Sequence, residues 1–165
     1  MNHIFCHDFF FRRCLLLSTH HGILRGLGVA VIVSILSLFF TKLQVHSLAI
    51  TIVVIVCTSA VFALGGFLNA VFARNFDDIS IIPSFVLTPL TYLGGVFYSI
   101  DMLGPFWKSL SMANPILHMV NAFRYGILGV SDIDITVAIS LMLLTTLILY
   151  VVCVRLLISG RGMRT

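Results

Sequence analysis

Charged residues are scarce in this chain, and glutamate is absent altogether. Only 10% of the 165 residues are charged, whereas 59% are hydrophobic; a soluble domain carries about 25% charged residues. A soluble fold of this length needs a charged shell, but the basic and acidic residues here fall almost entirely between long apolar runs. This composition excludes an ordinary water-soluble domain and indicates a protein that is surrounded by lipid.

Signatures of catalysis and cofactor binding are also missing from the sequence. There is no GxxxxGK(S/T) loop, no HExxH and no GxGxxG after a strand, so the chain has no visible means of hydrolysing a nucleotide. The four cysteines share no metal-ligand spacing. The formal net charge is +4, but the basic residues do not cluster with aromatic ones as a nucleic-acid-binding face requires. We therefore expect no enzyme activity, no cofactor or metal on this chain, and no nucleic-acid partner.

What the chain does contain is a set of four apolar runs. A bilayer core about 30 Å thick needs about 20 apolar residues per helix. The runs predict spans at about residues 22–40, 48–72, 79–98 and 135–154, the first of them marginal in length. Because only helices and closed barrels cross a bilayer, the sequence predicts an all-α, polytopic membrane protein with four transmembrane helices.

The basic residues are distributed unevenly between the two sides of these spans. If both termini are cytoplasmic, seven of the ten lie inside, and only Lys42, Lys108 and Arg124 lie outside. Cytoplasmic loops of membrane proteins carry an excess of Lys and Arg. The sequence therefore predicts a multi-pass protein with both termini in the cytoplasm.

The first 21 residues differ from the rest of the chain. They are rich in His and Phe without a clear helical period, and we expect a poorly ordered cytoplasmic lead-in over residues 1–21. In the span that follows, Gly22 and Gly26 form a small-xxx-small pair that lets a neighbouring helix approach. An equal alternative is that these glycines only loosen the start of the helix beside Arg25.

Several polar residues and prolines lie at or near the cytoplasmic ends of the second and third spans. Asn69 lies in hydrocarbon, where an amide needs a partner, so we expect an interhelical hydrogen bond, with a substrate contact as the alternative. Asp77 and Asp78 precede an apolar helix, where carboxylates cap free backbone N–H groups. An acid/base pair is less favoured, because adjacent carboxylates on one turn diverge. Pro83 and Pro89 predict a kink in the third span.

Residues 101–134 form the only long segment that does not span. Asn114 and Pro115 match the N-cap and first residue of a helix that should run to about Leu128 and stop at Gly129. Its apolar residues fall on one side, opposite His118, Asn121 and Tyr125. The helix is amphipathic and too short to span. We expect an outer segment that lies at the interface or enters the outer leaflet and returns, as a re-entrant segment does.

Two residues of this outer helix have side chains that could bind a ligand or a partner. His118 has no second metal ligand at a matching spacing, so we expect a solvated or interfacial histidine. Arg124 flanks an apolar helix. Its guanidinium either reaches lipid headgroups or pairs with an outer carboxylate, from Asp101, Asp132 or Asp134.

The sequence from Asn75 to Gly129 resembles the type-2 permease family of ATP-binding-cassette exporters, and the likeness extends from about Gly22 to Arg164. It contains DDIS at 77–80, PLTYLGGVFYS at 89–99 and an NP to RY stretch at 114–125, in that order. The resemblance implies a six-helix permease of the bacterial inner membrane that forms a homodimer and exports substrate by alternating access. A separate cytoplasmic ATPase subunit would bind ATP and Mg²⁺. Asn114, Pro115 and Arg124 match the outer signature of the family, and Asp77 and Asp78 its inner turn; none is implied to be catalytic.

The same resemblance implies that the first two helices of the family, and most of its ATPase-contacting loop, have no counterpart here. We therefore expect residues 22–165 to be a partial transmembrane domain of an N-terminally truncated copy that does not export by itself. From the residues alone, a small homo-oligomeric pore or a lipid-binding membrane protein remains an alternative. The spans contain no ring of charges that would select an ion, so the substrate stays open.

Overall fold

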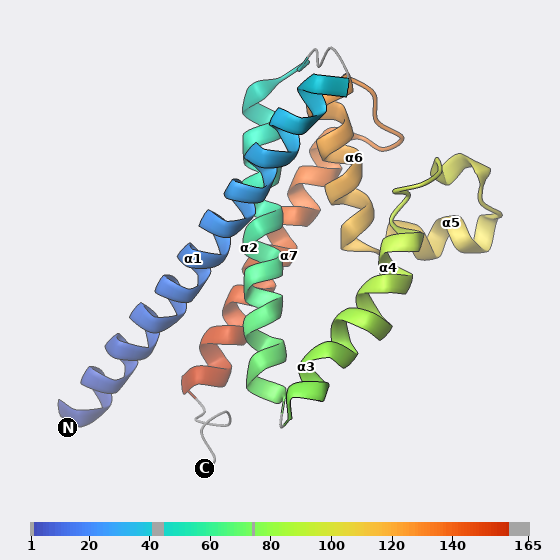
Figure 1. The fold of residues 1–165 in the computed structure, drawn as a ribbon. Helices are drawn as coiled ribbons and strands as arrows, with labels where there is room; N and C mark the ends of the chain where they lie inside the picture. Colours follow the sequence, from blue (N-terminus) through green and yellow to red (C-terminus); the bar gives the residue numbers. More distant parts are fainter. Residues whose placement is uncertain (1, 41–44, 74, 159–165) are drawn as a thin grey trace.

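The computed structural model describes residues 2–40, 45–73 and 75–158, which form helices joined by short connections (Figure 1). No strand occurs within these ranges. Three helices are long and apolar enough to cross a membrane: α1 (Asn2–Phe40, with its apolar part at Thr19–Leu36), α2 (Leu48–Phe72) and α7 (Ile135–Ile158). The predicted spans at 48–72 and 135–154 therefore correspond to α2 and α7, and the predicted all-helical class is confirmed.

Helix α1 begins earlier than the sequence predicted. It reaches back to Asn2, whereas we expected residues 1–21 to be a poorly ordered lead-in. No proline or glycine interrupts the chain between Asn2 and His21, and each residue added to an existing helix gains one backbone hydrogen bond. The helix of the first span therefore continues in the N-terminal direction.

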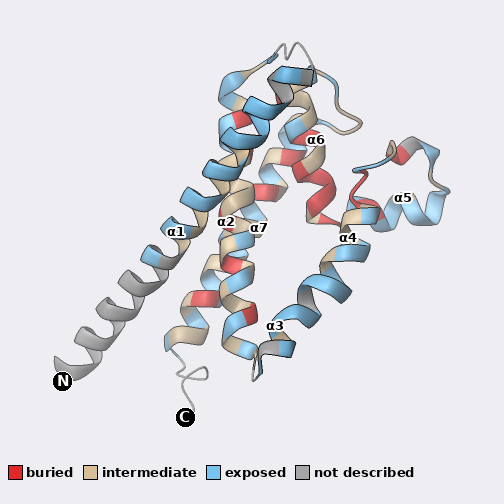
Figure 2. Ribbon diagram, in the orientation of Figure 1, coloured by how far each residue is buried: buried red, intermediate tan, exposed pale blue. Residues whose placement is uncertain are grey.

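Helices α1 and α2 pack closely where α1 carries glycine. A methyl group added to Gly22 would collide with Cβ of Ala63, and one added to Gly26 would collide with Oγ of Ser59. Both glycines thus lie on the face of α1 that contacts α2, as the small-xxx-small interpretation predicted. The outward face of α1 is exposed along the described part of its length (Figure 2).

The predicted span at 79–98 is not a single long helix. Its residues form α3 (Phe76–Ile82), the π-helical segment η1 (Pro83–Leu87) and α4 (Thr88–Leu93). Proline removes a helical donor and crowds the preceding turn, which explains why the helix widens at Pro83. Gly95 has φ of +67° and turns the chain away, so helical structure ends at Leu93. The predicted interruption of this span by proline is present, as a π-helical segment that begins at Pro83. Four transmembrane helices are not confirmed, because within the described ranges only three helices have spanning length.

We call α3, η1 and α4 together the broken arm. The segment that follows it contains a 3-10 turn, η2 (Ile100–Met102), and two helices, α5 (Pro105–Met112) and α6 (Pro115–Leu128). Helix α6 starts and ends at the residues that the sequence predicted. It lies against both α2 and α7, in the half of the bundle near the N-terminal end of α2 (Figure 1).

The most buried helix is α6, which corrects the expected orientation of its polar face (Figure 2). Its Met119 and Ala122 join residues of α2 and α7 in the main apolar core. His118 and Asn121, expected to face water or the interface, are 4% and 1% exposed. Phe123, on the apolar side, is 41% exposed. Both faces of α6 are thus partly buried. The polar groups of His118 and Asn121 bond to neighbouring backbone, Ile116 and Met119 of the apolar side pack inward, and Phe123 points outward.

Part of the predicted membrane orientation depends on residues that the structure does not describe. Lys42 belongs to residues 41–44, and Arg161 and Arg164 belong to residues 159–165. Together with Arg74, these positions lie outside the described residues, so the orientation stays a prediction.

Candidate functional site

The broken arm is attached to α6 by one side chain, Asn114. Its Oδ1 accepts a hydrogen bond from the Ile116 N–H at 3.0 Å and so caps the start of α6. Its Nδ2 donates to the Leu90 carbonyl at 2.6 Å. In a regular helix that carbonyl would accept from Gly94, but the Gly94 N–H bonds to Thr91 instead. Asn114 therefore satisfies the N-terminus of α6 and the C-terminus of α4 at once.

A second amide, Asn69, attaches the other end of the arm to α2. Its Nδ2 donates to the Ile79 carbonyl at 2.9 Å. That carbonyl lies four residues before Pro83, which has no N–H with which to complete the usual helical bond. The interhelical bond predicted for Asn69 is thus present, and the proline explains why the acceptor is free.

Arg124 joins the turn after α4 to the connection between α6 and α7. Its guanidinium donates to Oδ2 of Asp132 at 3.2 Å and to the Gly95 carbonyl at 3.1 Å. Ser99 also donates to Oδ2 of Asp132, at 2.9 Å. The Arg124 and Asp132 side chains are 25% and 17% exposed, so the pair is partly shielded from water. Of the three carboxylates that the sequence left open, the structure selects Asp132.

Asn121 completes this network, and sequence reasoning did not single it out. Its Oδ1 accepts from the Asp132 N–H at 3.1 Å, and its Nδ2 donates to the Leu117 carbonyl at 3.1 Å. The side chain thereby fixes the position of the backbone beside the Arg124 pair. The sequence did contain a signal for this role, a carboxamide within a largely apolar helix. We missed it because we assigned Asn121 to the face expected to meet water.

The opposite end of α6 is closed by the residues that precede α2. The His46 N–H donates to the Ile127 carbonyl at 3.1 Å, and the Ser47 N–H donates to the Gly126 carbonyl at 2.9 Å. Gly129 follows the helix with φ of +72°, the left-handed conformation that glycine adopts at a helix C-cap. Both ends of α6 are thus hydrogen-bonded to neighbouring elements.

Asp77 and Asp78 lie at the other end of the arm, away from Asn114 and Arg124 (Figure 1). Oδ2 of Asp78 accepts from the Asn75 N–H at 3.2 Å at the start of α3, while Asp77 is exposed. For Asp78 this geometry agrees with the predicted capping role. Asp134 acts similarly at the start of α7: its bonds to the Thr136 hydroxyl and to the Thr136 N–H hold the pKa of its carboxyl below the usual value.

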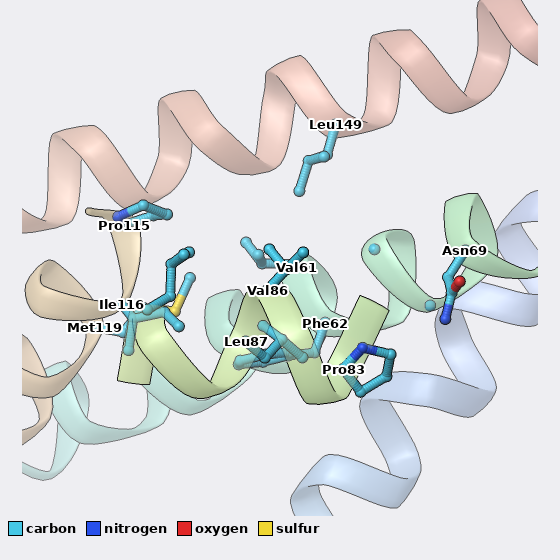
Figure 3. A pocket seen from close by; sticks show the side chains of 13 residues that line it. Val61, Phe62, Asn69, Pro83, Val86, Leu87, Pro115, Ile116, Met119 and Leu149 are labelled. Carbon is cyan, nitrogen blue, oxygen red and sulfur yellow. The ribbon is translucent and has the colours of Figure 1, made fainter. Parts of the chain in front are cut away.

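An apolar cavity of about 230 Å³ lies between the two amide attachments (Figure 3). It is bounded by α2, the broken arm, α6 and α7, with Asn69 near one end and Pro115 at the other. Among the described residues, no group of three His, Cys, Asp or Glu is close enough to bind a metal. The arrangement supports helix positioning and the accommodation of apolar molecules.

Long apolar helices, a proline-broken arm and a short buried helix define a polytopic α-helical membrane protein. Within this class, residues 15–128 match the ABC-2 type transporter family. The chain therefore belongs to that family, which confirms the resemblance found in the sequence.

Curated relatives are similar to most of the chain. The inner membrane transport permease YadH of Escherichia coli (strain K12) is 48% identical over 144 residues, which cover 87% of this chain and 56% of that protein. The permease of the same name from Shigella flexneri has the same identity and coverage. Nodulation protein J of Neorhizobium galegae is 27% identical over 104 residues, covering 63% of this chain and 40% of that protein. The chain thus spans about half the length of these YadH relatives. No solved structure matches it.

Proposed function

We propose that this chain is a membrane permease subunit of an ATP-driven exporter in the bacterial inner membrane. The observation that carries the proposal is the match of residues 15–128 to the ABC-2 type transporter family. The names of the YadH relatives, which are inner membrane transport permeases, support the same conclusion. ATP and Mg²⁺ would bind to a separate cytoplasmic ATPase, because this sequence has no phosphate-binding loop.

The proposed mechanism is alternating access, with the broken arm as the moving element. The arm is bonded to α2 through Asn69 and Ile79, and to α6 through Asn114 and Leu90. Between these attachments, η1 lacks the regular helical hydrogen-bond pattern and borders the apolar cavity. A change of bend at Pro83–Leu87 would alter the space between the arm and α2 while both attachments hold.

The proposed partners are the ATPase, a second copy of the permease and the surrounding lipid. The long helices leave large apolar side chains exposed, including Val31 and Ile35 on α1 and Leu147 on α7, which suits contact with lipid or with another membrane helix. The excess of basic residues on one side favours cytoplasmic termini. This orientation brings the start of α3 to the cytoplasmic face, where an ATPase would be found.

Coexpression with an ABC ATPase subunit from the same genome tests the proposed function. We expect any efflux from vesicles to require both the ATPase and ATP. Conductance across planar bilayers without ATPase would contradict the proposal and favour the pore. Cysteine labelling tests the proposed orientation. In a background without native cysteines, Ser131→Cys should react with an impermeant thiol reagent added from the outside. Labelling only after the inner face is opened would show the opposite orientation.

A further inference from the structure

The cavity between the broken arm and α2 is distinctive because it is almost free of polar groups. Its walls include Val61, Phe62, Val86, Leu87 and Leu149, and Gly65 and Gly66 form part of the α2 side (Figure 3). Asn69 is the only lining residue with a polar side chain. Its Nδ2 is already bonded to Ile79, and its Oδ1 is buried without a partner. The Oδ1 can therefore accept a hydrogen bond at one end of the cavity, and no other lining side chain can donate or accept one.

Water is a poor occupant for this space. A volume of about 230 Å³ would hold about eight waters at roughly 30 Å³ each. Each buried water needs two to four polar partners, and the walls do not supply them. Apolar cavities of this kind stay dry and accept apolar molecules.

The position and shape of the cavity favour a hydrocarbon chain. The α2 lining runs from Val61 to Asn69, a separation of eight residue steps or about 12 Å of helix at 1.5 Å per residue. Phe62 and Val86 are 45% and 47% exposed, so the cavity opens beside them onto the outer surface of the helices. On a membrane helix such as α2, that surface meets lipid.

We propose that the cavity bounded by α2, the broken arm, α6 and α7 binds one hydrocarbon chain, which enters beside Phe62 and Val86. The chain belongs either to a membrane lipid or to a free amphiphile, since both present the same methylene surface. It fills the space that the two amide attachments hold open between Asn69 and Asn114. This binding depends on the fold alone and not on transport.

Glycine substitutions provide a direct test. A Cβ added at Gly66 meets no atom within 4 Å, so Gly66→Leu should extend into the cavity without striking backbone. Gly28 on α1 also has open space at its Cβ position but does not line the cavity. Gly28→Leu is therefore the matched control, and Gly66→Ala is a milder variant that keeps the test valid if Gly66→Leu does not fold.

The measurement is photolabelling of the full chain in nanodiscs, with adducts mapped by mass spectrometry. One arm uses phosphatidylcholine with a diazirine in an acyl chain, and the other uses a diazirine-bearing free fatty acid. We expect adducts on Val61, Phe62 or Leu87 that fall about fivefold in Gly66→Leu, fall less in Gly66→Ala, and stay unchanged in Gly28→Leu. Labelling by the lipid identifies a bilayer occupant, and labelling by the fatty acid alone identifies a free amphiphile. Absence of these adducts with both probes, or equal labelling in parent and Gly66→Leu, would overturn the proposal.

Discussion

The double role of Asn114 leads to a prediction that separates its two hydrogen bonds. Asn114→Asp keeps the oxygen that accepts from Ile116, but it removes the Nδ2 that donates to Leu90. Asn114→Ala removes both bonds. Because Asn114 is 7% exposed, water cannot readily replace the lost donor. Asn114→Asp therefore keeps the cap while it loses the bond to Leu90, and it adds the cost of a buried carboxylate that faces the Leu90 carbonyl.

The expected losses of unfolding free energy follow from these contacts. A carbonyl left unsatisfied in a buried position costs about 1–3 kcal/mol, so Asn114→Asp should lose at least that amount, with the buried carboxylate adding to the loss. Loss of an N-cap costs a further ~1 kcal/mol. Asn114→Ala should thus lose about 2–4 kcal/mol, and the C-terminus of α4 should separate from α6 in both variants.

Denaturation of the purified protein in mixed micelles of mild detergent and SDS can measure both losses. The control is Asn75→Asp at the start of α3, where the residue is exposed and either side chain is an effective N-cap. That variant should stay within about 0.5 kcal/mol of the parent. If Asn114→Asp were as stable as the parent, the bond to Leu90 would not hold the arm, and the reasoning would be refuted.

Substitutions at Arg124, Gly126 and Asp134 test neighbouring features by the same measurement. Arg124→Leu should lose about 1–3 kcal/mol of unfolding free energy, because the bonds of Arg124 to a carboxylate and to a carbonyl both disappear. Arg124→Lys should retain part of that stability, and equal losses in the two variants would reject the role of Arg124 in holding both groups. Gly126→Ala should lower the unfolding free energy by about 1–3 kcal/mol, because the added Cβ would lie 3.1 Å from the backbone N of Thr51. Gly104→Ala is the control and should be neutral, because its Cβ position is open space. Asp134 caps α7, and its folded pKa is lower than its unfolded value of about 4. The cap therefore stabilises the protein fully above the unfolded pKa, and this stability is lost as the pH falls through the folded pKa. Asp134→Asn should remove this acid dependence; if the dependence persists, another group causes it.

Local signals in the sequence predicted α6 well. The helix starts and ends at residues that act only on the adjacent backbone: Asn114 and Pro115 at its start, and Gly129 at its end. Both ends of the helix were therefore predicted correctly. The length of α2 followed equally well from its continuous apolar run. Such features need no knowledge of the partners that a helix contacts.

The environment of α6 could not be read from the same signals. Periodicity shows that polar and apolar residues are on opposite faces, but it does not show which face meets protein. Inside a bundle of apolar helices, the side chain of Asn121 can bond to the Asp132 N–H, while Phe123 can face outward without cost in lipid. The prediction failed because it assumed water on the polar side.

The two attachments of the broken arm follow one physical rule that sequence reasoning could have used. Where Pro83 or the turn at Gly94 ends regular helical bonding, a carbonyl is left without its N–H partner. In hydrocarbon that carbonyl needs a donor, and a charged donor would cost more to bury than an amide. Asn69 and Asn114 meet this need at Ile79 and Leu90. An asparagine in an apolar helix is therefore best interpreted together with the prolines and glycines of neighbouring helices, since these determine which carbonyl it can bond.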